Sequence, residues 1–98
     1  MDRVFQGGAN EAWGYPNRLR GCIPDLDNLW GNVLAPLRGF PLEGRIRLVE
    51  ADYGNKAAVI SGLHAVCVGA VPGRDRVVIQ LSGHGDLLNG ESVVCLPG

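Results

Sequence analysis

Two patterns of apolar residues alternate along this chain of 98 residues, and together they leave few folds open. Runs of strand-forming residues lie at 45–49 and 76–81, with a shorter, glycine-rich candidate at 4–8. Between these runs lie two stretches whose apolar residues recur at helical spacing. Strand, helix, strand, helix, strand is the order of a parallel sheet joined by right-handed helical crossovers. The sequence therefore predicts the α/β class, with a mainly parallel sheet and helices packed on it.

The first helical stretch has an apolar stripe that repeats over three turns. Its members are Leu26, Leu29, Trp30, Val33, Leu34 and Leu37. Pro24 and Asp25 stand just ahead of the stripe and predict its first turn and its cap. Pro36 and Gly39 predict its end.

The second helical stretch follows Asn55, whose side chain can cap a helix. Its predicted apolar face consists of Ala57, Ile60, Leu63 and Cys67. The stretch ends before Pro72. The run at 76–81 is almost continuously apolar, which is typical of a strand covered on both faces. Beyond it, Asn89-Gly90 separates two apolar segments within 86–94 and predicts a hairpin with a type I′ turn.

Composition excludes several classes of protein. With 15 glycines and 6 prolines but 46% hydrophobic residues and no repeat, the chain should fold. A formal net charge of −1 leaves no basic surplus for nucleic acid. The sequence has no apolar run long enough to span a membrane, and its first residues lack the apolar core of a signal peptide. Three cysteines without a Cys-x-x-Cys pair argue against a disulfide framework or a zinc ribbon, and favour a reducing, cytoplasmic location.

The predicted third strand leads directly into Ser82-Gly83-His84-Gly85. In open α/β sheets the functional crevice lies at the carboxyl ends of the strands. Glycines on both sides of His84 allow a sharp turn that exposes the imidazole and leaves the Gly85 N–H free to meet a ligand. An imidazole there is suited to proton transfer near neutral pH. The alternative is an ordinary turn histidine in a glycine-rich protein.

A second candidate lies in the loop Gly21-Cys22-Ile23-Pro24-Asp25, ahead of the first helix. If a strand precedes this loop, Asp25 faces the same crevice as His84 and can bind a guanidinium or an ammonium group. The alternative makes Asp25 a helix cap that bonds only to its own backbone.

Three segments together resemble the amino-terminal half of a metacaspase, and more broadly the bacterial caspase-like cysteine peptidases. They are Asn-Arg-Leu-Arg-Gly-Cys-Ile-Pro-Asp at 17–25, Gly-Phe at 39–40, and Arg-Val-Val-Ile-Gln-Leu-Ser-Gly-His-Gly at 76–85. The resemblance extends from about residue 8 to residue 97. It implies a three-layer α/β/α fold, cut before the strand that leads to the nucleophile. It thus makes residues 1–98 the amino-terminal part of a catalytic domain.

The resemblance also implies roles for individual residues. His84 becomes the histidine of a Cys–His dyad and Gly85 an amide of the oxyanion hole. Asp25, with Cys22 in the same loop, becomes part of a substrate pocket that prefers Arg or Lys. The substrate would be a polypeptide.

The cysteine segment typical of this family is absent from the chain. Cys67 is expected in the core and Cys95 as a packed strand residue, while Cys22 at a helix start is the one alternative nucleophile. The isolated chain is therefore predicted to be inactive without the missing carboxy-terminal half, and to expose an apolar sheet edge.

No metal or cofactor is predicted. Some family members bind calcium after the histidine, but residues 86–97 contain only two acidic side chains, Asp86 and Glu91. Two other functions stay open: a catalytically inactive caspase-like interaction module, and a flavodoxin-like nucleotide-binding domain.

Overall fold

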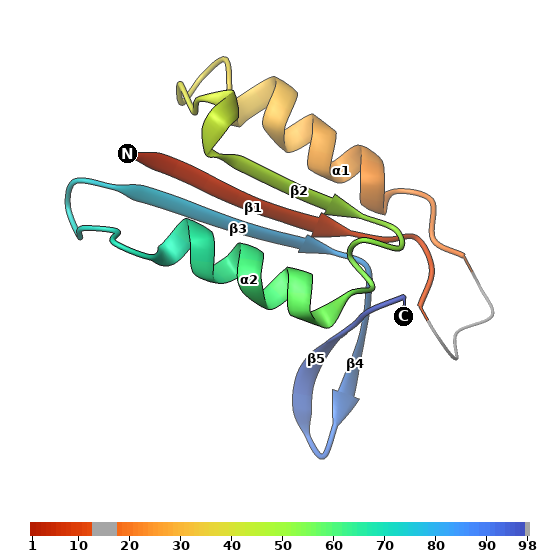
Figure 1. Ribbon diagram of the computed structural model, residues 1–98. Coiled ribbons are helices and arrows are strands. Elements are labelled where there is room, and N and C mark those ends of the chain that lie inside the picture. The colour runs from red at the N-terminus through yellow and green to blue at the C-terminus, as the bar shows by residue number, and fades with distance from the viewer. Residues whose placement is uncertain (13–17, 98) are drawn as a thin grey trace.

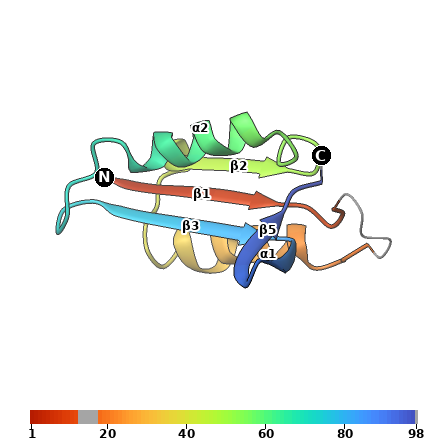
Figure 2. The ribbon, with the colours of Figure 1, turned by 90° about the horizontal axis from the view of Figure 1, so that it is seen from below.

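A computed structural model describes residues 1–12 and 18–97. Its main sheet has three parallel strands in the order β2-β1-β3, namely β1 (Asp2–Gly8), β2 (Arg45–Val49) and β3 (Arg76–Ser82). Helix α1 (Cys22–Leu29) covers one face of this sheet and α2 (Lys56–Cys67) covers the other (Figures 1 and 2). The predicted α/β class with a mainly parallel sheet is therefore confirmed.

The register brings the ends of the three strands to one level. β1 pairs with β3 from Asp2 opposite Arg76 to Gly8 opposite Ser82, and with β2 up to Val49, which also lies opposite Gly8. Because the strands are parallel, the loops that follow all three begin at this carboxyl edge. β1 is the central strand and is fully buried from Val4 onward, so both core layers are built on it.

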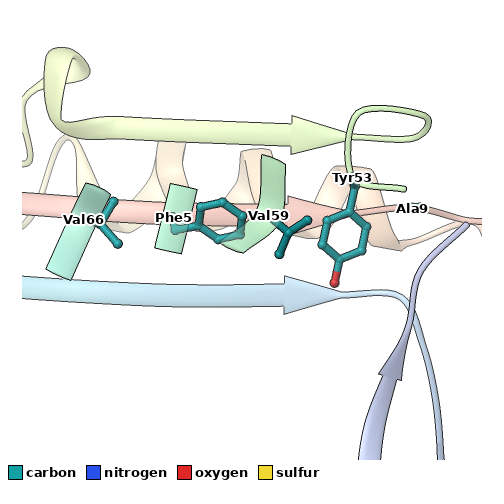
Figure 3. Packing of buried hydrophobic residues seen from close by; sticks show 5 residues of the cluster. All are labelled: Phe5, Ala9, Tyr53, Val59 and Val66. Atoms are coloured by element: carbon teal, nitrogen blue, oxygen red, sulfur yellow. The ribbon is translucent and has the colours of Figure 1, made fainter. Parts of the chain in front are cut away.

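The core on the α2 face is a row of side chains along β1 (Figure 3). Its buried members are Phe5, Ala9, Tyr53, Val59 and Val66. A smaller cluster of Val4, Leu34 and Phe40 packs on the α1 face. Gln6, buried between the layers, donates from Nε2 to the Leu26 carbonyl and to Gln80 Oε1, both at 2.7 Å. Its oxygen accepts from Arg45 Nε at 2.7 Å, so this buried amide is satisfied on both sides.

Helix α1 begins earlier than predicted. Its first residue is Cys22, and the backbone N–H of Asp25 already bonds to the Gly21 carbonyl at 2.9 Å. Asp25 is therefore inside the first turn, and its predicted capping role is wrong. Pro24 is tolerated there because the first N–H groups of a helix have no partner within it. The helix continues as a π-helical turn, Trp30–Leu34, and a short 3₁₀ turn, Leu42–Gly44, precedes β2.

Helix α2 is capped as predicted, but it buries a different face. Asn55 Oδ1 accepts from the Ala58 N–H at 3.2 Å. The buried residues are Val59, Gly62 and Val66, whereas Ile60 is 56% exposed and Cys67 is also exposed, so the predicted core position of Cys67 is wrong. The helix is apolar nearly all round, and the close fit of Gly62 over the Phe5 ring selects the observed face.

Strand β3 lies at one edge of the sheet and is not covered on both faces, contrary to the prediction. Ile79 is 49% exposed and Leu81 is 40% exposed. Figure 2 shows α2 lying over β1 and β2 more than over β3. Among the described residues no strand pairs with the outer side of β3, which agrees with the expected apolar edge.

The chain ends in a separate antiparallel hairpin of β4 (His84–Leu88) and β5 (Glu91–Cys95). Asn89 and Gly90 connect the strands with positive φ values of 51° and 80°. Positive φ at both central residues defines a type I′ turn, so the prediction is confirmed. The hairpin projects from the carboxyl edge of the main sheet (Figure 1). In the described part of the chain, no helix has the length and apolar character required to cross a bilayer.

Candidate functional site at the carboxyl edge of the sheet

His84 lies where the main sheet meets the hairpin. A single residue, Gly83, separates it from β3, and His84 is itself the first residue of β4 rather than part of a longer turn, which corrects the prediction. Its side chain is half-buried, and Nε2 lies 3.2 Å from the backbone carbonyl oxygen of Asn10. Gly83 lies against the loop that follows β1, since a Cβ at this position would be in ordinary van der Waals contact with the Ala9 carbonyl oxygen at 3.4 Å.

Asn10 connects His84 to the loop before α1. It is buried, and its side-chain oxygen accepts from the Cys22 N–H at 3.1 Å. Its backbone carbonyl also accepts from the Leu19 N–H at 2.8 Å. The same residue therefore fixes the amino terminus of α1 and meets the histidine ring. Sequence reasoning missed Asn10, and the only signal was its position directly after a buried strand.

Asp25 lies beside the carboxyl end of β3. Its Oδ2 is 3.5 Å from the Ser82 hydroxyl, and its backbone carbonyl accepts from Gln80 Nε2 at 3.3 Å. The residue is exposed, and within the described part of the chain no cation bonds to its carboxylate. A carboxylate in the first helical turn is also stabilised by the helix dipole. Asp25 is thus a charged group open to a ligand, and it contacts Ser82, which precedes His84 by two residues in the sequence.

Cys22 is only 6% exposed and packs at the inner side of the same edge. Nearby, Tyr53 is fully buried, and burial raises the pKa of its hydroxyl, with a smaller electrostatic contribution from Cys22. Figure 3 shows the Tyr53 ring at the end of the core row, with its oxygen directed toward the end of β3. Among the described residues this hydroxyl has no hydrogen-bond partner.

Gly85 and the remaining cysteines occupy different places. Gly85 is exposed within β4, opposite Val94. Cys95, the last residue of β5, is half-buried and pairs directly opposite His84. Cys67 is the last residue of α2, and Figure 1 shows that α2 ends toward the amino ends of the strands. Asn17, the first residue of the segment 17–25, lies outside the described residues.

The site therefore contains one imidazole, one open carboxylate and ordered backbone groups. None of the three cysteines forms a disulfide bond. Over residues 1–12 and 18–97, His, Cys, Asp and Glu side chains form no group of three that could hold a metal ion. Two pockets of about 470 and 480 Å³ lie elsewhere, one around Arg3 and Ile46 and the other around Phe40 and Val77. The chemistry available at the carboxyl edge is proton transfer and binding of a cationic group.

Comparison with known proteins does not assign the chain to a family. No family model matches the sequence, and no curated protein or solved structure shows significant similarity to it.

Proposed function

We propose that the chain is the amino-terminal part of the catalytic domain of a caspase-like cysteine endopeptidase that cleaves polypeptides after Arg or Lys. The main support is that the two segments with the strongest resemblance to this family lie together. His84 of Ser-Gly-His-Gly and Cys22 of the Gly-Cys-x-x-Asp loop both contact Asn10. Residues 10 and 84 are far apart in sequence, so sequence proximity alone does not explain this contact.

In this proposal His84 is the general base that takes the thiol proton and later protonates the leaving amine. A free thiol is mostly protonated at neutral pH and needs such a base. The Asn10 carbonyl at 3.2 Å holds the imidazole in one orientation. The Gly85 amide is assigned to the oxyanion hole, where one donor contributes about 10²–10³ in rate.

Asp25 and Cys22 are assigned to substrate binding. The exposed Asp25 carboxylate can accept a bidentate guanidinium or a single ammonium group, which favours Arg or Lys before the cleaved bond. Cys22 is too buried to attack a substrate, and it lines the loop that presents Asp25. We propose no metal, cofactor, nucleic acid or membrane partner. Three cysteines without a disulfide bond favour a reducing, cytoplasmic setting.

The nucleophilic cysteine of this peptidase is proposed to come from a carboxy-terminal half outside these 98 residues. The test is expression of the complete reading frame and cleavage of a peptide with Arg before the cleaved bond. His84→Ala should lower kcat/KM by about 10²–10⁴. His64→Ala, an exposed histidine on α2, is the matched control and should leave kcat/KM unchanged. Full turnover by the His84→Ala protein would refute the proposal.

A catalytically inactive interaction module is the second candidate, and one observation favours it. The apolar side chains of Ile79 and Leu81 are exposed on an edge strand, and such edges bind added strands. Under this alternative the complete protein cleaves no peptide, whereas the peptidase proposal requires cleavage that depends on His84.

A further inference from the structure

The hairpin brings a thiol to the same imidazole. Cys95 in β5 lies directly opposite His84 in β4. Directly opposed residues of an antiparallel pair direct their side chains to the same face, with Cβ atoms about 4.5–5.5 Å apart. The imidazole and the thiol therefore project from the same face of the hairpin as cross-strand neighbours, and both side chains are half-buried.

The contact with Asn10 determines which ring nitrogen of His84 can act as a base. A backbone carbonyl only accepts hydrogen bonds, so Nε2, 3.2 Å from the Asn10 oxygen, carries the proton of the neutral ring. Nδ1 is then the basic nitrogen. The Asn10 carbonyl thus orients the imidazole, and the imidazole is the base for a neighbouring thiol. This is the general arrangement of activated nucleophiles.

The other two cysteines lack this arrangement. Cys22 is buried, whereas Cys67 is exposed at the last residue of α2. The partial negative charge at a helix carboxyl terminus disfavours a thiolate there. Reactive cysteines are partly exposed and lie beside a group that stabilises or creates the thiolate. Only Cys95 of the three meets both conditions.

We infer that Cys95 is a nucleophilic thiol activated by His84, so that the 98-residue chain contains a Cys–His pair of its own. The inference rests on the proposed role of His84 as a base, and it gives that base a second thiol, inside the chain, in addition to the nucleophile proposed for the carboxy-terminal half. The acyl donor expected at this pair is an ester or amide of a basic amino acid, because Asp25 contacts Ser82, two residues before His84.

The reaction is an acyl transfer without oxidation or reduction. His84 Nδ1 takes the thiol proton, and the Cys95 sulfur attacks the carbonyl carbon of the donor. A carbon–sulfur bond forms and the carbon–oxygen or carbon–nitrogen bond to the leaving group breaks. The imidazolium then gives its proton to the leaving alcohol or amine. The products are an acyl thioester on Cys95 and the free leaving group.

The test uses the 98-residue chain and the p-nitrophenyl ester of an amino-blocked arginine. We expect a burst of about one nitrophenolate per chain and an arginyl adduct at Cys95 by peptide mapping. Cys95→Ser should abolish the burst, and His84→Gln should slow it by about tenfold or more. Cys67→Ser is the control and should leave the burst unchanged. An adduct that forms at Cys67 as fast as at Cys95 would overturn the inference.

A second measurement needs no variant at His84, which could disturb the fold. In the native wild-type chain, iodoacetamide should alkylate Cys95 at least about tenfold faster than Cys67, although Cys67 is the more exposed thiol. Equal rates refute the inference. If Cys95 is inert but the complete protein still needs His84 for cleavage, only the inference fails. If Cys95 reacts but the complete protein cleaves nothing, only the proposed peptidase fails.

Discussion

Acidic residues at the two ends of the main sheet differ in their partners: Asp2 and Asp75 at the amino ends are paired with cations, whereas Asp25 at the carboxyl ends is not, although Glu11 and Glu50 at that end pair with Arg18. At the amino ends of the strands, the Arg76 guanidinium donates two hydrogen bonds to the Asp2 carboxylate, from Nε at 2.8 Å and from Nη2 at 2.6 Å. Asp75 binds the Met1 ammonium, the Arg74 guanidinium and the Val71 N–H. At the carboxyl ends, within the described residues, Asp25 meets only the Ser82 hydroxyl and no cation.

Under the proposed function, this difference separates the residues that stabilise the fold from those that bind the substrate. Paired charges at the amino end hold the first residues of the chain to the start of β3. An exposed carboxylate that is not used for folding keeps its charge available for a ligand. Substitutions at the carboxyl end should therefore change binding and reactivity, and substitutions at the amino end should change stability.

Among the carboxylates at the two ends of the sheet, the largest effect is expected at Asp25, measured on the complete protein. Asp25→Ala should lower kcat/KM for peptides with Arg before the cleaved bond by about 10- to 100-fold, because one charge-assisted contact is lost. The melting temperature should hardly move, since Asp25 is exposed. Asp52→Ala, another exposed carboxylate, is the control. An unchanged preference for Arg would remove Asp25 from the binding site.

At the opposite end, Asp75→Asn should lower the melting temperature by a few degrees and leave ester or peptide reactivity unchanged. The asparagine loses the charge attraction to both Arg74 and the chain terminus. Calorimetry compares the melting temperature of this variant with that of the control variant Asp52→Asn. A variant that loses reactivity but keeps its melting temperature would contradict the division between the two ends.

The same end should govern acid stability. Side-chain hydrogen bonds from Arg76 and Arg74 lower the pKa values of Asp2 and Asp75, respectively, below the usual range. A carboxyl whose pKa is lower in the folded state stabilises it fully above the unfolded value of about 3.9, and this stabilisation is lost as pH falls through the folded value. Melting temperatures between pH 6 and pH 2 should fall below pH 4, and the fall should be shallower in Asp2→Asn/Asp75→Asn.

The smallest effect is expected for Tyr53→Phe in the core under the carboxyl edge. Among the described residues the Tyr53 hydroxyl has no partner. Removing a buried hydroxyl that makes no hydrogen bond should change the free energy of unfolding by less than about 1 kcal/mol, in either direction. Urea denaturation of the two proteins tests this. A loss well above that value would show that the hydroxyl is bonded in solution.

Much of the fold follows from local sequence, but the site follows from it only in part. Alternating apolar patterns predict the parallel sheet, and Asn89-Gly90 predicts the hairpin. A two-residue turn at 89–90 also sets the register, so the pairing of His84 with Cys95 could have been found from the sequence. The role of Asn10 could not have been found from the sequence, because its contact with His84 depends on the path of the chain after β1. The buried face of α2 was missed because Val59 and Ile60 are equally apolar, and only the fit of Gly62 against Phe5 decides between them.

That fit has an evolutionary consequence. Added methyl groups at Gly62 and at Gly7 would overlap the rings of Phe5 and Tyr53, respectively, so each aromatic residue occupies the space that its glycine leaves free. Neither partner can change alone without a clash or a void. Among divergent descendants of this chain, positions 5 and 62 should therefore mutate as one pair, and positions 7 and 53 as another.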